Sequence, residues 1–555
     1  MKKIIIILLA LSAVLAASCG KFLDTGLDIK ADSESLATNR GSIWSFANAF
    51  YSPMISGFSV IDGNIFASAS DEAEQTSASS TVLYFNKGML NSSVNPLWTY
   101  YNNCYEGIRA ANFFLDYVAD GKGIALLEMN RNLVTDAVNY KRDLASLNWY
   151  IAEAHVARAY YYAELIKMYG GVPIVEKTQE ASGGAMVPRS TYEECVEYIV
   201  KEIDDWKDKL SDSWKDNAGY EGRLTRGAAM AIKARVLLYA ASPLHNSSHD
   251  LTKWQRAAKA AADLISDPYL NYGLDPDYAS YFRGSNSLTS KESIYIVRRG
   301  NTNDLEKNNY PIATSGGKSG VCPTQNLVGA YEYIGAANAS DPYANRDPRL
   351  QASIVVNGST WNGRTIAEAK GETDDMSGMN ASKTGYYLKK FLTDGLNLVQ
   401  DQKAQHNWVA YRWGEVLLNY AEALNECFGP SAVPTGYPYS ATAALKLVRD
   451  RASMSLPPIA AATVDSFREA VKRERRVELA FEDHRYWDLL RWKDAATVLN
   501  KPVQGVEISK SAGAYTYKVV DVAPRTFNED KNYYLPFMRS EIQNSKGTLE
   551  QNPGY

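Results

Sequence analysis

Two short patterns in this sequence contain residue types that could bind a phosphate group or a metal ion. Residues 316–319 read Gly-Gly-Lys-Ser, as at the end of a phosphate-binding loop, but Ile312 stands where such a loop needs its first glycine. His245 and His249 lie four residues apart in a Ser- and Asn-rich stretch. The zinc motif with that spacing carries a Glu between the histidines and lies on a helix. We therefore predict no nucleotide site, no metal site and no cofactor.

The other histidines do not form a catalytic pattern with a nucleophile. His155, His406 and His484 are scattered along the chain, and no Ser or Cys motif accompanies them. A glycosidase needs only two carboxylates at a set separation, and the chain has 63 Asp and Glu residues, so an enzyme stays open as an alternative. We predict no catalytic residues.

Aromatic residues are the group best suited to binding a ligand. The chain has 37 Tyr against 15 Phe, with 11 Trp, so most of its ring area carries a polar group and suits half-exposed contact surfaces. Tyr84, Phe85 and Asn86 lie in a polar stretch, residues 68–95, that has little helical periodicity to bury them. An exposed ring beside an amide could stack on a sugar and hydrogen-bond its hydroxyl groups. Ordinary packing of these rings is the alternative.

The charge pattern argues against a nucleic-acid partner. The formal net charge is −4, and the sequence has no block of five or six like charges. The segment 472–476 is basic, but Glu474, Glu478 and Glu482 follow one another at four-residue spacing. Alternating charges at this spacing on a helix predict an intramolecular ion-pair face.

The N-terminus has the features of a secretory signal. Lys2 and Lys3 precede an apolar run that is too short to span a membrane, and small residues lead to Cys19. This arrangement resembles a bacterial lipobox, in which the cysteine is lipidated. We predict a signal peptide over residues 1–18 and a lipidated tether over residues 19–35, which would anchor the protein without spanning the membrane.

The elements that must position any binding residues are mainly helices. Apolar residues recur at spacings of three and four along most of the chain, and a capping-box spacing, Ser190 with Glu193, supports one of the helix starts. The segments with this periodicity are 98–118, 144–169, 192–210, 225–241, 254–265, 412–427, 441–451 and 467–492. We predict a mainly α fold.

The helices fall into similar pairs, with one loop-rich interruption. Residues 227–265 and 415–451 each give a helix, a loop with proline and a second helix, which is typical of a tetratricopeptide-like array; an unrelated helical bundle is the alternative. Residues 267–409 are dense in Gly, Asn, Ser and Thr and lose the helical periodicity. We expect an N-terminal helical part over 36–266, a loop-rich, ligand-facing excursion over 267–409 and a C-terminal helical part over 410–555.

The order of motifs along the chain resembles the SusD/RagB family of outer-membrane nutrient-binding lipoproteins of Bacteroidota. The motifs that carry the resemblance are residues 18–24, 69–73, 98–112, 158–162, 169–173, 345–349, 411–415, 473–482, 485–489 and 551–555. They extend over nearly the whole chain. The resemblance implies a tetratricopeptide-like α fold and a binder that holds a glycan at the cell surface for a SusC-like TonB-dependent transporter.

The resemblance also suggests where a ligand would bind. In starch-binding members, aromatic residues before the position of Trp98 and in the later loop-rich excursion form the binding platform. By region, the implied ligand-binding residues here are Tyr84, Phe85, Asn86, Tyr281, Phe282, Tyr310 and Trp361. A peptide-binding, RagB-like importer subunit and a scaffold that binds no nutrient are the alternatives.

Overall fold

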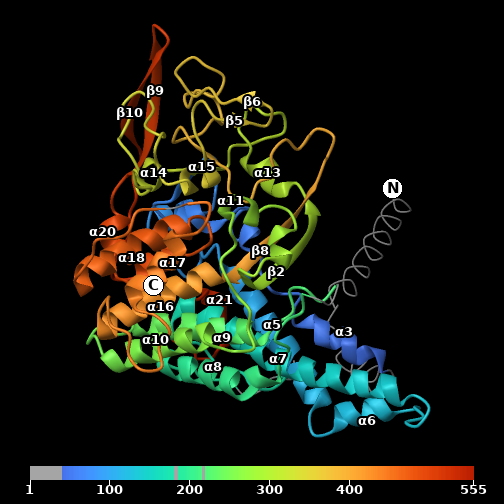
Figure 1. Ribbon diagram of the computed structural model, residues 1–555. Helices are drawn as coiled ribbons and strands as arrows, with labels where there is room; N and C mark the ends of the chain where they lie inside the picture. The colour runs from blue at the N-terminus through green and yellow to red at the C-terminus, as the bar shows by residue number, and fades with distance from the viewer. Residues whose placement is uncertain (1–39, 180–185, 216–218, 455) are drawn as a thin grey trace, which may run out of the picture.

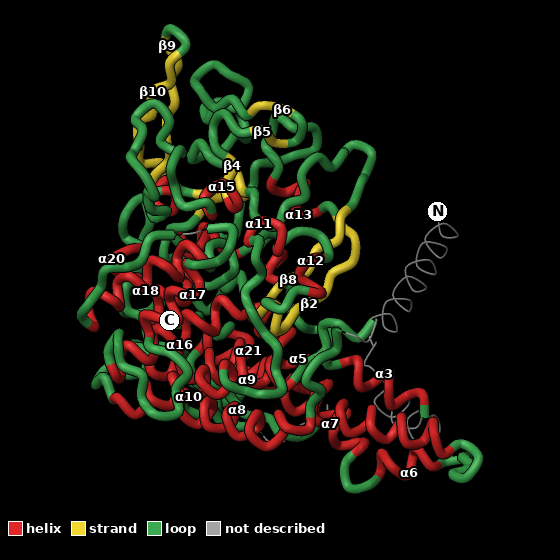
Figure 2. The backbone as a smooth tube through the Cα atoms, viewed as in Figure 1, coloured by secondary structure: helices red, strands yellow, loops and turns green. Residues whose placement is uncertain are grey.

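The computed structural model describes residues 40–179, 186–215, 219–454 and 456–555. The predicted signal peptide, the tether and Cys19 lie outside the described residues. Figure 1 shows the helices gathered in one half of the molecule and long loops with short strands in the other half, and Figure 2 shows the same division by element type. The prediction of a mainly α fold with a loop-rich excursion is confirmed.

The long helices follow one another in a packed series. They are α3 (Gly41–Ala49), α5 (Trp98–Val118), α6 (Lys122–Glu128), α7 (Ala137–Tyr169), α8 (Tyr192–Trp206), α9 (Arg226–Ala241), α10 (Leu251–Ile265), α16 (Trp413–Phe428), α17 (Ala441–Arg449) and α18 (Val464–Glu478). Each of α7, α8, α9, α10 and α16 packs against the next in this order, and α16 also packs against α17 and α18. Burial against sequential neighbours is the arrangement expected of a helix-pair array.

The start of α8 lies one residue later than the capping-box spacing indicates. Thr191, not Ser190, is the N-cap: its side chain accepts a hydrogen bond from the Glu194 backbone N–H, and the Glu194 carboxylate accepts one from the Thr191 backbone N–H. Both spacings fit the motif, so the sequence alone could not choose between them.

The segment 467–492, predicted as one helical stretch, is two helices. α18 ends at Glu478 and α19 (Arg485–Arg491) follows after a turn in which Phe481 and Asp483 have positive φ values of 66° and 62°. The Phe481 ring is fully buried in a second hydrophobic core, away from the main helical core. The helix thus breaks where the Phe481 ring enters the second core. The apolar periodicity of the sequence did not reveal this break.

The loop-rich half is organised by short antiparallel strand pairs. The strands are β1 (Ala73–Gln75), β2 (Ser293–Thr302), β3 (Val321–Pro323), β4 (Ile354–Val355), β5 (Thr360–Trp361), β6 (Arg364–Thr365), β7 (Tyr387–Leu388) and β8 (Ala404–Arg412). The pairs are β1 with β3, β2 with β8, β4 with β7 and β5 with β6. Because β1 pairs with β3, a segment of the predicted N-terminal helical part belongs to the loop-rich half.

The remaining helical elements of the described chain are short. They are η1 (Gly57–Ser59), η2 (Phe66–Ala69), α4 (Leu83–Asn86), η3 (Lys207–Lys209), α11 (Tyr278–Tyr281), α12 (Asn286–Thr289), α13 (Asp304–Asn309), α14 (Gln325–Val328), α15 (Arg349–Ser353), α20 (Ala495–Val498) and α21 (Arg539–Asn544).

The predicted C-terminal helical part also contains a β-hairpin. β9 (Val503–Ser511) pairs with β10 (Ala514–Ala523) in antiparallel register, and the hairpin extends beside the loops of the excursion (Figure 1). Gly385 of the excursion packs against the backbone of Val506 in β9. The predicted boundary at residue 410 therefore does not separate the two halves in space.

A buried ion-pair network joins the two halves, as the charge spacing on α18 predicts. The Glu478 side chain is fully buried and accepts hydrogen bonds from the Arg412, Arg451 and Arg349 guanidiniums, each at 2.8 Å. Burial raises the pKa of Glu478, but the three guanidiniums outweigh burial and hold the pKa well below its ordinary value. Among the described helices, none combines the length and apolar composition of a membrane span.

Candidate functional site

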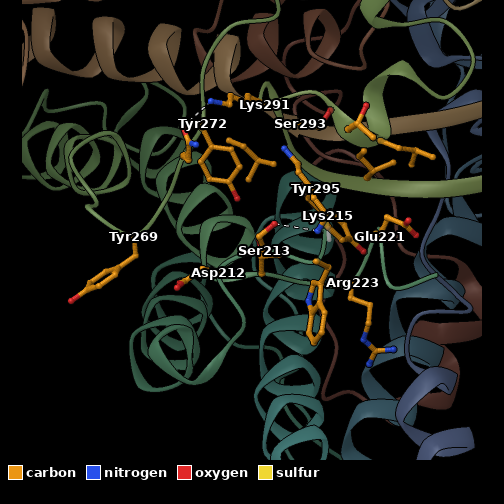
Figure 3. Close-up of a pocket in the computed structure, with 18 residues that line it drawn as sticks. Asp212, Ser213, Lys215, Glu221, Arg223, Tyr269, Tyr272, Lys291, Ser293 and Tyr295 are labelled. Carbon is orange, nitrogen blue, oxygen red and sulfur yellow. Dashed lines mark hydrogen bonds between the residues drawn. The ribbon is translucent and has the colours of Figure 1, made fainter. Parts of the chain in front are cut away.

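A cavity of about 480 Å³ opens where the helical array meets the loop-rich half (Figure 3). Its lining comes from three segments: the loop before α9, the segment after α10 and the beginning of β2. The lining residues used below are Ser213, Trp214, Lys215, Tyr269, Asn271, Tyr272, Thr289, Lys291 and Ser293.

Helix ends and one glycine bring these segments together. Thr225 caps α9, its side chain accepting a hydrogen bond from Ala228 N–H at 3.1 Å, so the preceding loop turns sharply at the cavity. Gly227, in the first turn of α9, faces the Tyr272 ring. A Cβ atom at Gly227 would lie 2.2 Å from the Tyr272 hydroxyl oxygen. The ring can therefore reach the cavity only because this position has no side chain.

Two aromatic rings, those of Trp214 and Tyr272, line the cavity and are held by other parts of the protein. Trp214 is buried and donates from Nε1 to the Leu224 carbonyl at 3.1 Å, which fixes the indole. Tyr272 stacks on Trp413 with ring centroids 5.8 Å apart. Figure 3 shows the Tyr272 ring among the other lining side chains. Both rings are held by contacts behind the wall and are thus placed before any ligand arrives.

Two lysines and several neutral polar groups surround the rings. The Lys215 ammonium donates to the Ser290 carbonyl at 2.6 Å. Burial, together with the positive charge of Lys291, lowers the pKa of Lys215 to about 8. Lys291 donates to the Asn271 side-chain oxygen at 3.3 Å. Ser213, Asn271, Thr289 and Ser293 add hydroxyl and amide groups, which can both donate and accept hydrogen bonds.

Tyr269 is the most exposed aromatic ring of the lining. Its side chain is 68% exposed, and the Arg226 guanidinium lies 5.2 Å from its ring centroid. Arg226 is held in turn by Asp267, whose carboxylate lies 2.7 Å from Nη2. A ring supported by a fixed guanidinium, with most of its surface in solvent, can stack on the apolar face of a sugar ring.

The cavity thus combines rigid aromatic surface with hydrogen-bonding groups of both kinds. That combination suits a ligand with apolar C–H faces and many hydroxyl groups, because stacking provides contact area while the polar groups select orientation. Within the residues that the structure describes, no cluster of three or more His, Cys, Asp or Glu side chains could hold a metal ion.

The two short patterns considered in the sequence have structural roles. His245 is stacked on Tyr192, with ring centroids 3.5 Å apart, and burial, with a contribution from Lys253, lowers its pKa to about 3. The Ser319 hydroxyl accepts a hydrogen bond from the Ile312 backbone N–H at 2.8 Å, which closes the 312–319 loop on itself.

Most of the aromatic residues predicted to bind the ligand are part of the two cores. Phe85, Tyr281, Phe282, Tyr310 and Trp361 are each less than 10% exposed. Phe85 packs edge-on against Phe66 with centroids 5.0 Å apart, and Tyr310 packs edge-on against Trp361. Rings buried in this way present no free face to a sugar, so the predicted platform of these five residues is corrected: they pack the protein interior.

The other two predicted residues differ from these five. Asn86 is also buried, and neither atom of its side-chain amide has a hydrogen-bond partner in the described part of the chain. Tyr84 is partly exposed and packs on the edge of the main core. Of the predicted aromatic residues, Tyr84 is therefore the one that is still partly exposed and could contact a ligand.

One of the buried residues supports the cavity wall from behind. The Tyr281 hydroxyl lies 2.8 Å from the Ser293 hydroxyl, and Ser293 lines the cavity. Sequence reasoning missed Trp214, Lys215, Tyr269 and Tyr272, because neither of the two short segments that carry them forms a motif. The loss of helical periodicity at residue 267 was the signal nearest to them.

A helical array with a loop-rich face and an aromatic, polar cavity defines a class of α-helical ligand-binding proteins. Two family models of SusD-like proteins match this chain over consecutive parts. A family model described as "SusD family" matches residues 287–555, and one described as "Starch-binding associating with outer membrane" matches residues 21–238.

Similar proteins agree with these matches. SusD-like protein P2 of Formosa agariphila is 22% identical over 435 residues, which cover 77% of each chain. A crystal structure of a SusD-like protein from Bacteroides fragilis has a TM-score of 0.75 at 24% identity, covering 94% of this chain and 98% of that one. A laminarin binding SusD-like protein has a TM-score of 0.64 at 21% identity, covering 93% and 100%. These structures share the fold of this chain.

Proposed function

We propose that this protein binds a glycan at the cell surface and delivers it to a SusC-like TonB-dependent outer-membrane transporter. The family matches support this function, since one matching model is described as starch-binding and associating with the outer membrane. Relatives of the same fold include a "SusD-like carbohydrate binding protein" and a laminarin binding protein. The protein is a binder and not an enzyme, and lipid attached to Cys19 holds it at the outer membrane.

The observation that carries the proposal is the exposed Tyr269 ring at a cavity with a fixed aromatic wall. Its guanidinium support and the neighbouring hydroxyl and amide groups provide what a sugar needs: a stacking surface and directional hydrogen bonds. Delivery requires release, so we expect modest affinity, with a Kd of about 1 μM to 1 mM.

The test is binding of a soluble form that lacks residues 1–19, a change that leaves every described residue in place. Purified polysaccharides, their oligosaccharides and a set of peptides are compared by affinity electrophoresis and calorimetry. Tyr269→Ala should weaken binding of the preferred glycan about tenfold, because loss of one stacked ring costs roughly 1–2 kcal/mol. Tyr439→Ala, at a partly exposed tyrosine in the loop between α16 and α17, is the matched control.

The outcomes distinguish the remaining alternatives. Binding of one glycan class that Tyr269→Ala weakens and Tyr439→Ala does not supports both the function and the cavity. Glycan binding that Tyr84→Ala weakens instead places the ligand at the other partly exposed ring. Binding of peptides alone replaces the proposal with a peptide importer, and binding of neither replaces it with a scaffold of the transporter.

A further inference from the structure

A second hollow, of about 770 Å³, lies on the outer face of α18, away from the cavity described above. One face of this helix lines it, at Ser466, Glu469, Arg473 and Arg476, positions that recur every three or four residues. The segment 458–461, which reads Pro-Ile-Ala-Ala, provides an apolar wall. We call this hollow the α18 groove.

The α18 groove contains two arginines that share a single carboxylate. Asp71 accepts from Arg476 Nη2 at 2.6 Å and from Arg485 Nε at 2.7 Å. Both arginines line the groove, and both side chains are less than 20% exposed. Two guanidiniums around one carboxylate leave a surplus of one positive charge in a mostly buried position, where charge is weakly screened.

The neighbouring acid does not neutralise this surplus. Burial raises the pKa of Glu72 to about 8, so its carboxyl is mostly protonated at neutral pH. Burial also lowers the pKa of Arg476, and the positive charge of Arg485 adds to that effect. In addition, Arg476 Nε is buried without a hydrogen-bond partner among the described residues. The positive charge of Arg476 and Arg485 is therefore only partly neutralised by Asp71.

The other acids of the groove lie beside basic residues, and among them Glu469, with its side chain 73% exposed, has its carboxylate 3.6 Å from the Lys472 ammonium. Asp494 pairs with Lys472 at 2.7 Å, and Glu332 accepts a hydrogen bond from Arg449. Arg473 points outward with its side chain 52% exposed, and its nearest carboxylate, that of Glu332, is 3.8 Å away. Arg473 thus lines the same groove as the arginine pair, and its guanidinium has no carboxylate closer than 3.8 Å among the described residues.

We infer that the α18 groove binds an oxyanion, the carboxylate of an acidic saccharide, with Arg473 as its accessible contact. Guanidiniums recognise carboxylates through parallel hydrogen bonds, and the incoming charge would offset the surplus on the arginine pair. The Pro-Ile-Ala-Ala wall gives the C–H face of a sugar ring an apolar surface. This inference rests on the proposed function and names uronic-acid units as a class of glycan that the protein takes.

The test compares the same oligosaccharide with and without its carboxylate charges. Oligogalacturonate and its methyl ester are titrated into the soluble form by calorimetry, with the wild type, Arg473→Gln and Arg142→Gln. Arg142 is the matched control, an arginine on α7 with its side chain 69% exposed. We expect the acid to bind about tenfold more tightly than the ester, the preference to fall severalfold in Arg473→Gln only, and inorganic sulfate to compete.

Equal binding of acid and ester, binding of neither, or a preference unchanged in Arg473→Gln would overturn the inference. Each of these results leaves the proposed function intact if a neutral glycan from the panel binds and depends on Tyr269. Absence of carbohydrate binding of any kind would overturn both. Thermal unfolding of the two variants checks that they are folded, and Arg473 is exposed enough for its replacement to leave the core unchanged.

Discussion

Asp71 and Arg485, 414 positions apart in the sequence, are joined by two hydrogen bonds, of 2.7 Å from Nε to Oδ1 and 3.1 Å from Nη2 to Oδ2. The pair fixes the segment before α5 to the helix that follows α18. Because Arg476 of α18 binds the same carboxylate, the Asp71 side chain holds the segment before α5 against both α18 and α19.

Asp71→Asn should destabilise the protein strongly. Removing the charge leaves two mostly buried guanidiniums without a counter-charge, which costs about 3–5 kcal/mol. The measurement is the free energy of unfolding in urea at pH 7. Asp205→Asn, which breaks an exposed pair with Lys201, should cost less than about 1 kcal/mol. Similar losses in the two variants would contradict a special role for Asp71.

The same variant should show a defined pH dependence. Burial raises the pKa of Asp71, but Arg476 and Arg485 outweigh it and hold the pKa well below the ordinary value of 3.8. A lowered native pKa gives stability that is present above pH 3.8 and is lost as the pH falls towards the native value. The difference in free energy of unfolding between the wild type and Asp71→Asn should therefore be largest at pH 5 to 7 and should decrease below pH 4.

Glu72→Gln should have the opposite pH dependence. Burial raises the pKa of Glu72 from 4.5 to about 8, so the native state keeps a proton that the unfolded chain releases. The stability that this proton provides is present below pH 4.5 and is lost as the pH rises to 8. The stability of Glu72→Gln relative to the wild type should therefore rise by roughly 4 kcal/mol between pH 4.5 and pH 8. Thermal unfolding of both proteins at pH 5, 6.5 and 8 tests this; parallel curves would refute it.

Gly107→Ala should destabilise the contact between α5 and α7. A Cβ atom at position 107 would lie 2.1 Å from the Tyr161 ring, inside the main core. Alanine favours a helix by about 1 kcal/mol over glycine, but overpacking costs about 1–3 kcal/mol, so we expect a net loss. Gly273→Ala is the control, since a Cβ there has no neighbour within 4 Å. Equal urea midpoints for Gly107→Ala and the wild type would show that the Tyr161 ring moves aside without cost and would contradict the prediction.

Cys19→Ala should release the protein from the membrane if Cys19 is the lipidation site. More than one acyl chain gives stable membrane anchoring, and the predicted lipobox cysteine is the residue that would carry them. The measurement is the share of the protein in the membrane fraction of the producing cells, with Cys427→Ala as a control. An unchanged membrane fraction in Cys19→Ala would contradict the lipid anchor.

The sequence by itself determined the helical character of the fold, because apolar residues at spacings of three and four are a local property of each segment. It also indicated the loop-rich region and the ion-pair face of α18. It did not reveal the break at Phe481, since that ring is buried among segments far away in the chain.

The exposure of single side chains was decided only by the tertiary structure. Tyr310 and Trp361 lie in a polar, loop-rich region, yet strands and turns from distant segments bury both rings. Conversely, Tyr269, Tyr272 and Trp214 line one cavity only because three segments converge beside α9. Local periodicity reports which face of an element is apolar, whereas a binding cavity depends on which distant elements meet, and that is a property of the packed chain.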